Sequence, residues 1–307
     1  MNIKTVAIIG LGALGTMYAN HFTKKLSKDA VRVVADSQRI ERYKNEGVYS
    51  NNELCDLNYV STDEILEPAD LIIFSVKCNH LEQAIADAKN QIGENTIILS
   101  ALNGISSEEI IGSAFGMDKV LYCVAQGMDA VKEGNRLTYV NMGILSFGEK
   151  NNEMYSDKVK AVAEFFHSTA LPYEVPLDMY QRQWGKFMLN TGLNQTTAVF
   201  GVPYGGVQTP GQPRETMIKA MEEVITLAKE EGINLSKDDI NYWLSIVDSL
   251  SPLGKPSMLQ DVEAKRPTEV ELFSGTAIAL GKKHGVPTPI NDWLYEKIID
   301  LENICKK

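Results

Sequence analysis

The sequence has 307 residues, and at about 150 residues per domain this length predicts two domains. Hydrophobic residues make up 44% of it and charged residues 23%, which excludes a wholly disordered chain. Forty acidic residues against thirty basic ones give a net charge of −10, the wrong sign for binding nucleic acid or an anionic membrane.

Other class markers are missing from the sequence as well. The apolar runs of the sequence, such as the one near residues 71–76, are far shorter than the roughly 18 residues that a membrane span needs. The amino terminus enters a strand pattern at once, so we expect no signal peptide. The four cysteines and four histidines are scattered without metal-ligand spacing, so we expect reduced thiols, no metal and a cytoplasmic protein.

The first half of the chain alternates short apolar strands with helices. Strands are predicted at residues 5–9, 31–35, 71–76, 96–99 and 120–125. Helices are predicted up to residue 26 and at residues 38–47, 80–91 and 106–115. This alternation predicts a parallel sheet buried on both faces. Residues 135–147 are expected to close that sheet with antiparallel strands.

The second half is nearly free of strand patterns. A helix is predicted from residue 157, and Pro172 and Pro176 then mark a domain boundary. Further helices are predicted at residues 179–199, 214–231, 237–250, 267–284 and 291–305, with a loop at 201–213. We therefore expect an α/β Rossmann domain with a doubly wound, mostly parallel sheet at residues 1–172, followed by an all-α domain at residues 173–307.

The segment GLGALG follows the first predicted strand and opens a helix, the setting in which such a loop binds a dinucleotide. Its first glycine permits a tight turn, its second lets a pyrophosphate approach the backbone, and its third allows close packing of helix on strand. The loop residues expected to contact the cofactor are Gly10, Leu11, Gly12, Ala13, Leu14 and Gly15.

An acidic residue, Asp36, ends the second predicted strand. A carboxylate there accepts hydrogen bonds from the adenosine ribose and repels a 2′-phosphate, which favours NADH. Arg39 and Arg42, on the following helix, could instead surround a phosphate, or they could belong to a solvated charged face.

The stretch WGKFMLNTGLN places Lys186, Asn190 and Asn194 four residues apart, on one face of a largely apolar helix. Polar groups on a buried helix need partners or a ligand, although a solvated face is the alternative. Pro267 suits a first helical position and puts Glu269 in the first turn, where it could simply complement the helix dipole. The residues alone do not connect these two segments.

Lys77 and Asn103 each come just after a predicted strand. In a doubly wound sheet, ligands bind beyond the carboxyl ends of the strands. Both side chains are therefore candidates for contacting the dinucleotide, and a surface role is the alternative for Lys77.

Six motifs in series resemble the ketopantoate reductase (2-dehydropantoate 2-reductase) family over almost the whole chain. They are GLGALG, SVK at residues 75–77, LNG at residues 102–104, the K-x₃-N-x₃-N helix, FGVPYG at residues 200–205, and SMLQD…RPTE. The resemblance implies a Rossmann domain and a helical domain with an active site in the cleft between them.

The same resemblance implies roles for residues. Lys186 would be the general acid that protonates the substrate carbonyl oxygen, and Glu269 would bind the cofactor ribose or the substrate and help orient Lys186. Asn103 would bridge the nicotinamide ribose and the substrate, and Lys77 would lie along the cofactor. The substrate hydroxyl and carboxylate would be bound by Asn190, Asn194 and Ser257.

Two positions depart from the family pattern. The best-known members hold the NADPH phosphate with an arginine where this chain has Asp36, and some bind substrate with an asparagine where it has Tyr204. The resemblance implies NADPH-dependent reduction of ketopantoate to pantoate, in pantothenate biosynthesis. The alternatives are an NAD-dependent D-2-hydroxyacid dehydrogenase acting on branched or aromatic 2-oxo acids, and a non-catalytic dinucleotide-binding sensor. Apolar helices of the second half could pair two subunits in a homodimer or pack within one chain.

Overall fold

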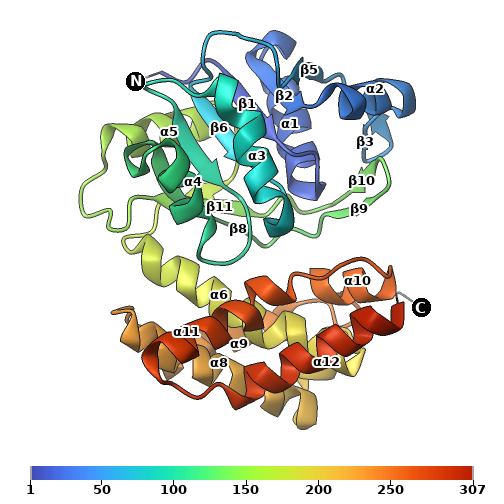
Figure 1. Cartoon of the computed structure of the whole chain (residues 1–307), viewed down its shortest axis with the longest axis vertical. Coiled ribbons are helices and arrows are strands. Elements are labelled where there is room, and N and C mark those ends of the chain that lie inside the picture. The colour runs from blue at the N-terminus through green and yellow to red at the C-terminus, as the bar shows by residue number, and fades with distance from the viewer. Residues whose placement is uncertain (1, 306–307) are drawn as a thin grey trace. The chain divides into compact units, whose positions relative to one another are not determined.

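The computed structural model describes residues 2–305, which form two compact units that divide between Tyr180 and Gln181 (Figure 1). The division lies later in the chain than the expected boundary after residue 172. The reason is β12 (Tyr173–Glu174), which pairs in parallel with β11 (Ile144–Gly148) and so adds a strand to the first unit. Within the described residues, no helix is long and apolar enough to cross a membrane.

The first unit is built on an eight-stranded sheet with the order β12-β11-β8-β7-β6-β1-β2-β5. Its other strands are β1 (Val6–Ile9), β2 (Val31–Ala35), β5 (Asn58–Ser61), β6 (Leu71–Phe74), β7 (Ile97–Ser100) and β8 (Val120–Gln126). Every pairing is parallel except that of β11 with β8. The central strands β1, β6 and β7 are buried at every residue, which explains their unbroken apolar runs.

Helices cover both faces of this sheet, as the alternation of strands and helices predicted (Figure 1). They are α1 (Ala13–Lys25), α2 (Ser37–Glu46), α3 (Leu81–Ala88), α4 (Ser107–Phe115) and α5 (Asp157–Ser168), with single 3₁₀ turns at η1 (Lys28–Ala30), η2 (Cys78–His80), η3 (Lys89–Gln91) and η4 (Met117–Lys119). Alternate residues of β1 point to opposite faces. Ile8 packs in one core cluster with Phe22 of α1 and Phe166 of α5, whereas Ile9 packs in another with Leu81 of α3.

A second, four-stranded sheet has the order β4-β3-β10-β9. Its strands are β3 (Tyr49–Ser50), β4 (Glu53–Leu54), β9 (Val131–Glu133) and β10 (Arg136–Thr138). The expectation that residues 135–147 close the main sheet is therefore wrong in part, because only β11 joins that sheet. Leu137 is fully buried between exposed neighbours, and the Asn135 amide donates to the carbonyls of Glu46 and Gly47, so β10 is fixed beside β3 instead.

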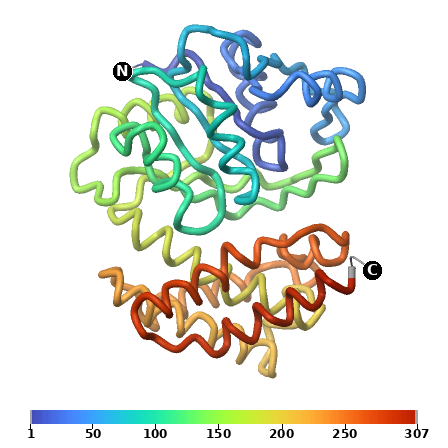
Figure 2. The backbone as a smooth tube through the Cα atoms, viewed as in Figure 1, coloured from blue at the N-terminus to red at the C-terminus, as the bar shows by residue number. Residues whose placement is uncertain are grey.

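The described residues of the second unit form helices joined by loops, and Figure 2 shows its path in yellow to red. Its elements are α6 (Met179–Phe200, which begins in the first unit), α7 (Gly205–Gln208), α8 (Gln212–Glu230), α9 (Lys237–Ser249), α10 (Ser257–Glu263), the 3₁₀ turn η5 (Val270–Leu272), α11 (Ser274–His284) and α12 (Pro289–Cys305). The fold class is thus the expected one, an α/β unit with a mostly parallel sheet followed by a helical unit.

Buried polar contacts tie the helices of this unit together. Asn291, fully buried at the start of α12, donates to Glu223 of α8 at 2.7 Å and accepts from Ser274 of α11 at 3.1 Å. Gln195 of α6 donates to the same Asn291 oxygen at 3.4 Å.

The helix predicted at residues 267–284 begins later, at Ser274, so the placement of Glu269 in its first turn is wrong. Thr268 donates both its N–H (2.8 Å) and its hydroxyl (2.6 Å) to Glu302 of α12. These tertiary bonds satisfy the hydrogen-bonding groups of Thr268, which would otherwise take part in a helix. Glu269 instead precedes η5, and its carbonyl accepts from the Leu272 N–H at 3.0 Å.

Candidate functional site

The glycine loop lies between β1 and α1, as predicted, and two of its glycines are required by the fold itself. Gly10 has a φ of +95°, and a Cβ there would lie 2.9 Å from the Ser75 carbonyl oxygen. A Cβ on Gly15 would lie 1.9 Å from the Gly10 carbonyl oxygen. Neither position accepts a side chain, whether or not a ligand binds.

Gly12 is different, because the protein has room for a side chain at this position. Its φ of −67° is ordinary for any residue, and a Cβ would meet only the Ser75 carbonyl oxygen, at 3.4 Å. Gly12 is the N-cap of α1, and no side chain caps the helix there. The N–H groups of the first turn have no partner within the helix and favour an anion. A glycine that packing does not require fits the close approach of a pyrophosphate to this backbone.

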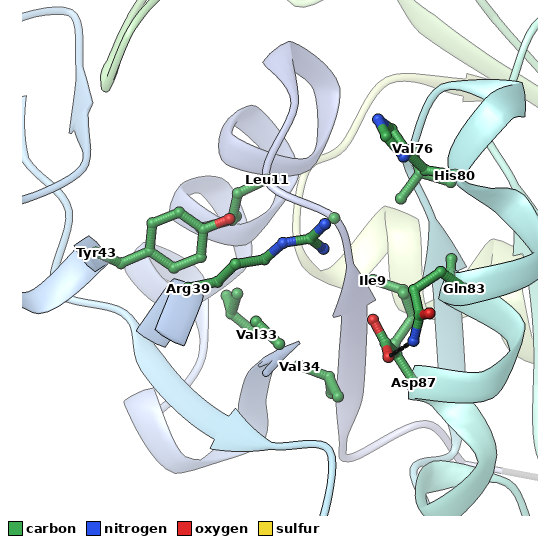
Figure 3. A pocket seen from close by; sticks show the side chains of 13 residues that line it. Ile9, Leu11, Val33, Val34, Arg39, Tyr43, Val76, His80, Gln83 and Asp87 are labelled. Carbon is green, nitrogen blue, oxygen red and sulfur yellow. Dashed lines mark hydrogen bonds between the residues drawn. The ribbon is translucent and has the colours of Figure 1, made fainter. Parts of the chain in front are cut away.

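A pocket opens beside the loop, at the carboxyl ends of β1 and β2 (Figure 3). Its apolar side includes Ile9, Val33 and Val34, and α2 adds the side chains of Arg39 and Tyr43. The remaining lining comes largely from the region of α3, namely Val76, His80, Gln83, Ala84 and Asp87. An apolar pocket with a few polar groups, at this edge of a doubly wound sheet, is the place where such folds bind ligands.

The α3 contribution was missed from the sequence. Gln83 donates to Asp87 at 2.8 Å, one helical turn apart. The spacing of His80, Gln83 and Asp87 on one helix face was the available signal, but nothing in it indicated which way that face points.

Asp36 has a structural task as well as a place near the pocket. It is the N-cap of α2, and one carboxylate oxygen accepts from the Arg39 N–H at 2.8 Å. Its other oxygen lies 3.3 Å from Arg39 Nε, and about half of each side chain is exposed. Arg39 lines the pocket, whereas the Arg42 guanidinium lies over the Tyr43 ring. A carboxylate and a guanidinium therefore stand together at the end of β2.

Lys77 and Asn103 follow two neighbouring strands at the same edge of the sheet. The Ser75 N–H donates to the Ile9 carbonyl at 2.9 Å, and the Ala101 N–H donates to the Phe74 carbonyl at 2.8 Å. The chain segments after β1, β6 and β7 thus continue side by side. The structure brings Lys77 and Asn103, both partly buried, to the edge where the glycine loop lies.

In the second unit, the three predicted α6 residues share one helical face. Lys186 is partly buried, while Asn190 and Asn194 are only 8% and 6% exposed. Within residues 2–305, the side-chain amides of these two asparagines make no hydrogen bond. These amides can still donate and accept hydrogen bonds, so this face is suited to a polar ligand.

Ser257 and Glu269 belong to the same unit as the α6 face. Ser257 is the exposed first residue of α10, and Glu269 is partly buried just before η5. Sequence reasoning missed the support beneath Glu269, which is the pair of bonds from Thr268 to Glu302. Among the described residues, no three His, Cys, Asp or Glu side chains are grouped to hold a metal ion.

A mostly parallel sheet with a glycine loop at its ligand-binding edge, joined to a helical unit, is an arrangement typical of dinucleotide-dependent oxidoreductases. The model of the family described as "Ketopantoate reductase PanE/ApbA" matches residues 6–152, and that of its C-terminal part matches residues 178–302. The chain belongs to the ketopantoate reductase family. It is therefore an NAD(P)-dependent oxidoreductase of the class that acts on CH–OH groups.

One relative carries the family's name, and two solved structures share the fold. The 2-dehydropantoate 2-reductase of Aquifex aeolicus is 28% identical over 95% of this chain and 94% of that protein. The structure of D-mandelate dehydrogenase with NADH and anilino(oxo)acetate has a TM-score of 0.87 at 23% identity, covering 99% of this chain and 100% of that one. A dimeric ketopantoate reductase from Staphylococcus aureus has a TM-score of 0.79 at 20% identity, covering 98% and 99% of the two chains.

Proposed function

We propose that this protein reduces ketopantoate to pantoate, by hydride transfer from a nicotinamide dinucleotide to a 2-oxo acid. The observation that carries the proposal is Gly12, a glycine that the fold does not need, at the start of an uncapped helix beside a pocket. This backbone fits a dinucleotide pyrophosphate. The substrate is that of the relative from Aquifex aeolicus.

The bound nicotinamide would supply the hydride, and the protein would supply placement and a proton. As hydride arrives at the carbonyl carbon, negative charge develops on the carbonyl oxygen. The Lys186 ammonium would stabilise this charge and then donate the proton. Lysine suits the task because its ammonium is a compact donor.

The remaining candidates would hold the reactants. The unbonded amides of Asn190 and Asn194 would bind the substrate hydroxyl and carboxylate, together with Ser257. Glu269 would orient Lys186 and contact the cofactor or substrate, with its own segment held by the Thr268–Glu302 bonds. At the sheet edge, Lys77 and Asn103 would contact the cofactor.

A second candidate is an NAD-dependent D-2-hydroxyacid dehydrogenase acting on branched or aromatic 2-oxo acids. Asp36 favours it, because a carboxylate at the end of β2 suits the free ribose of NADH and repels the 2′-phosphate of NADPH. The adjacent Arg39 could instead attract that phosphate. The residues therefore favour NADH, while the family resemblance favours NADPH.

Steady-state kinetics with NADH and NADPH, each against ketopantoate and 2-oxoisocaproate, test both candidates. We expect ketopantoate to have the highest kcat/KM. A value at least about tenfold below that of 2-oxoisocaproate, a difference of roughly 1.4 kcal/mol, would support the second candidate and contradict the first.

Replacing Lys186 tests the assignment of the general acid. We expect Lys186→Ala to lower kcat by about 10²–10⁴-fold, the usual contribution of such a group. Lys219→Ala, which removes an exposed lysine from α8 of the same unit, is the matched control and should leave kcat unchanged. Undiminished turnover in Lys186→Ala would show that the proton comes from another group.

A further inference from the structure

A lysine from the small sheet reaches the glycine loop of the large one. The Lys132 ammonium, on β9, donates to the Leu11 carbonyl and, at 2.9 Å, to the Thr16 hydroxyl. The Thr16 hydroxyl in turn donates to the same Leu11 carbonyl, at 3.4 Å. Leu11 is 8% exposed and Thr16 is fully buried, so these acceptors lie within the protein.

These contacts fix the middle of the loop. Leu11 stands between Gly10 and Gly12, and Thr16 donates the first backbone bond of α1, from its N–H to the Gly12 carbonyl at 3.1 Å. Lys132 therefore binds both sides of the segment that turns from strand to helix. Because the Leu11 carbonyl accepts these bonds, its negative end is directed to the ammonium.

Among the described residues, no carboxylate forms an ion pair with Lys132. Within residues 2–305 it makes no ion pair, and the titratable groups that face it are Cys55 and Arg42. Burial lowers the pKa of Lys132 to about 8, and the positive charge of Arg42 adds to this shift. Burial also raises the pKa of Cys55 to about 11, so the thiol is neutral where Lys132 titrates. A cation without an anionic partner thus lies against the loop.

We propose that Lys132 is a positioning residue for the dinucleotide, which holds the glycine loop in its binding conformation and supplies positive charge toward the pyrophosphate. The proposal rests on the proposed function in one respect, that a dinucleotide binds at this loop. It assigns a task to the small sheet, which carries the lysine to its place.

If Lys132 has this role, the affinity of the protein for the dinucleotide should depend on pH. Lys132 is charged below pH 8 and neutral above it. A nearby pyrophosphate favours the charged form, so binding raises the pKa of Lys132 and is linked to proton uptake. We therefore expect affinity to be greatest below pH 8 and to fall by about fivefold to tenfold between pH 7 and pH 9.

The experiment measures the Kd of NADH and NADPH by calorimetry from pH 6.5 to 9.5. The variants are Lys132→Met, which removes the charge, and Lys132→Arg, which keeps a charge that does not titrate in this range. The matched control is Lys158→Met, because Lys158 also donates to a backbone carbonyl, that of Asp118. At pH 7 we expect Lys132→Met to bind about fivefold to tenfold more weakly than the wild type, with kcat at saturating dinucleotide preserved.

The pH profiles separate positioning from mere structural support. The wild type and Lys158→Met should lose affinity with a midpoint near pH 8, whereas both Lys132 variants should lack this step. A wild-type profile in Lys132→Met overturns the inference and leaves the proposed function standing. If Lys132→Met fails to fold, the profile of Lys132→Arg decides, and a step near pH 8 there refutes the proposal. Failure of the wild type to bind either dinucleotide at any pH removes both the inference and the proposed function.

Discussion

Replacing Gly12 with alanine separates the needs of the fold from those of the ligand. Alanine adopts the φ of −67° and ψ of −163° found at this position, and its Cβ would lie 3.4 Å from its nearest neighbour, an ordinary contact. At an N-cap, alanine is less favourable than glycine by a few tenths of a kcal/mol or somewhat more. Alanine also restricts the unfolded chain, which acts in the opposite direction. We therefore expect the free energy of unfolding to change by no more than about 0.5 kcal/mol.

The effect on dinucleotide binding should be much larger. The added methyl group occupies the side of the backbone to which the pyrophosphate must come. Forcing an extra methyl group into a close-packed contact costs about 1–3 kcal/mol. At about 1.4 kcal/mol per factor of ten, this corresponds to a Kd roughly 10- to 100-fold weaker.

Gly15→Ala is the contrasting variant, because its Cβ would lie 1.9 Å from the Gly10 carbonyl oxygen. It should destabilise the unit by about 3 kcal/mol or more. Thermal unfolding followed by circular dichroism and titration with NADH measure the two effects. If Gly12→Ala folds normally and binds NADH as the wild type does, the loop is not where the pyrophosphate lies.

Two further predictions concern Asp36 and Asn291. Asp36→Ala should lose the N-cap of α2, which is worth about 1 kcal/mol of stability, whereas Asp36→Ser should keep it. Both variants remove the negative charge, so both should improve the Kd of NADPH relative to that of NADH by about tenfold. An unchanged Kd ratio in Asp36→Ser would exclude contact with the ribose. Asn291→Ala leaves the buried Ser274 hydroxyl without its acceptor and removes one hydrogen bond each from Glu223 and Gln195. It should lower stability by about 2–3 kcal/mol, or roughly 5–10 °C in Tm. Asn303→Ala, an exposed position on the same helix, should leave Tm unaltered, and a similar Tm for both variants would contradict this account.

The main elements of the fold were predictable because each has a strong local pattern. Central strands such as β6, buried at every residue, are apolar throughout, and the glycine loop marks the first turn. The short strands β3, β4 and β5 were missed, because segments such as Asn58–Ser61 are polar and only partly buried. Their pairing depends on partners elsewhere in the chain, so no local period reveals it.

Residues of the candidate site were likewise predictable where a local motif marks them, and not where they depend on distant parts of the chain. Loop and helix motifs indicated Gly12 and Asn190, since spacing alone places them at a strand end and on a helix face. Lys132 carried no signal, because the residue whose carbonyl it binds lies 121 positions away. Helix starts were also misjudged, as at Pro267, where a local preference was overridden by the bonds from Thr268 to Glu302.

The central position of β1 determines the order in which the first unit can assemble during synthesis. β1 leaves the ribosome before both of its neighbours, since Val6 pairs with Val31 on one side and with Leu71 on the other. At about 5–20 residues per second, one edge of this wholly apolar strand stays without its partner for roughly 3–13 s. An unpaired apolar edge is a template for aggregation. Recombinant yield should therefore improve at low temperature or with added chaperones, whatever the stability of the finished protein.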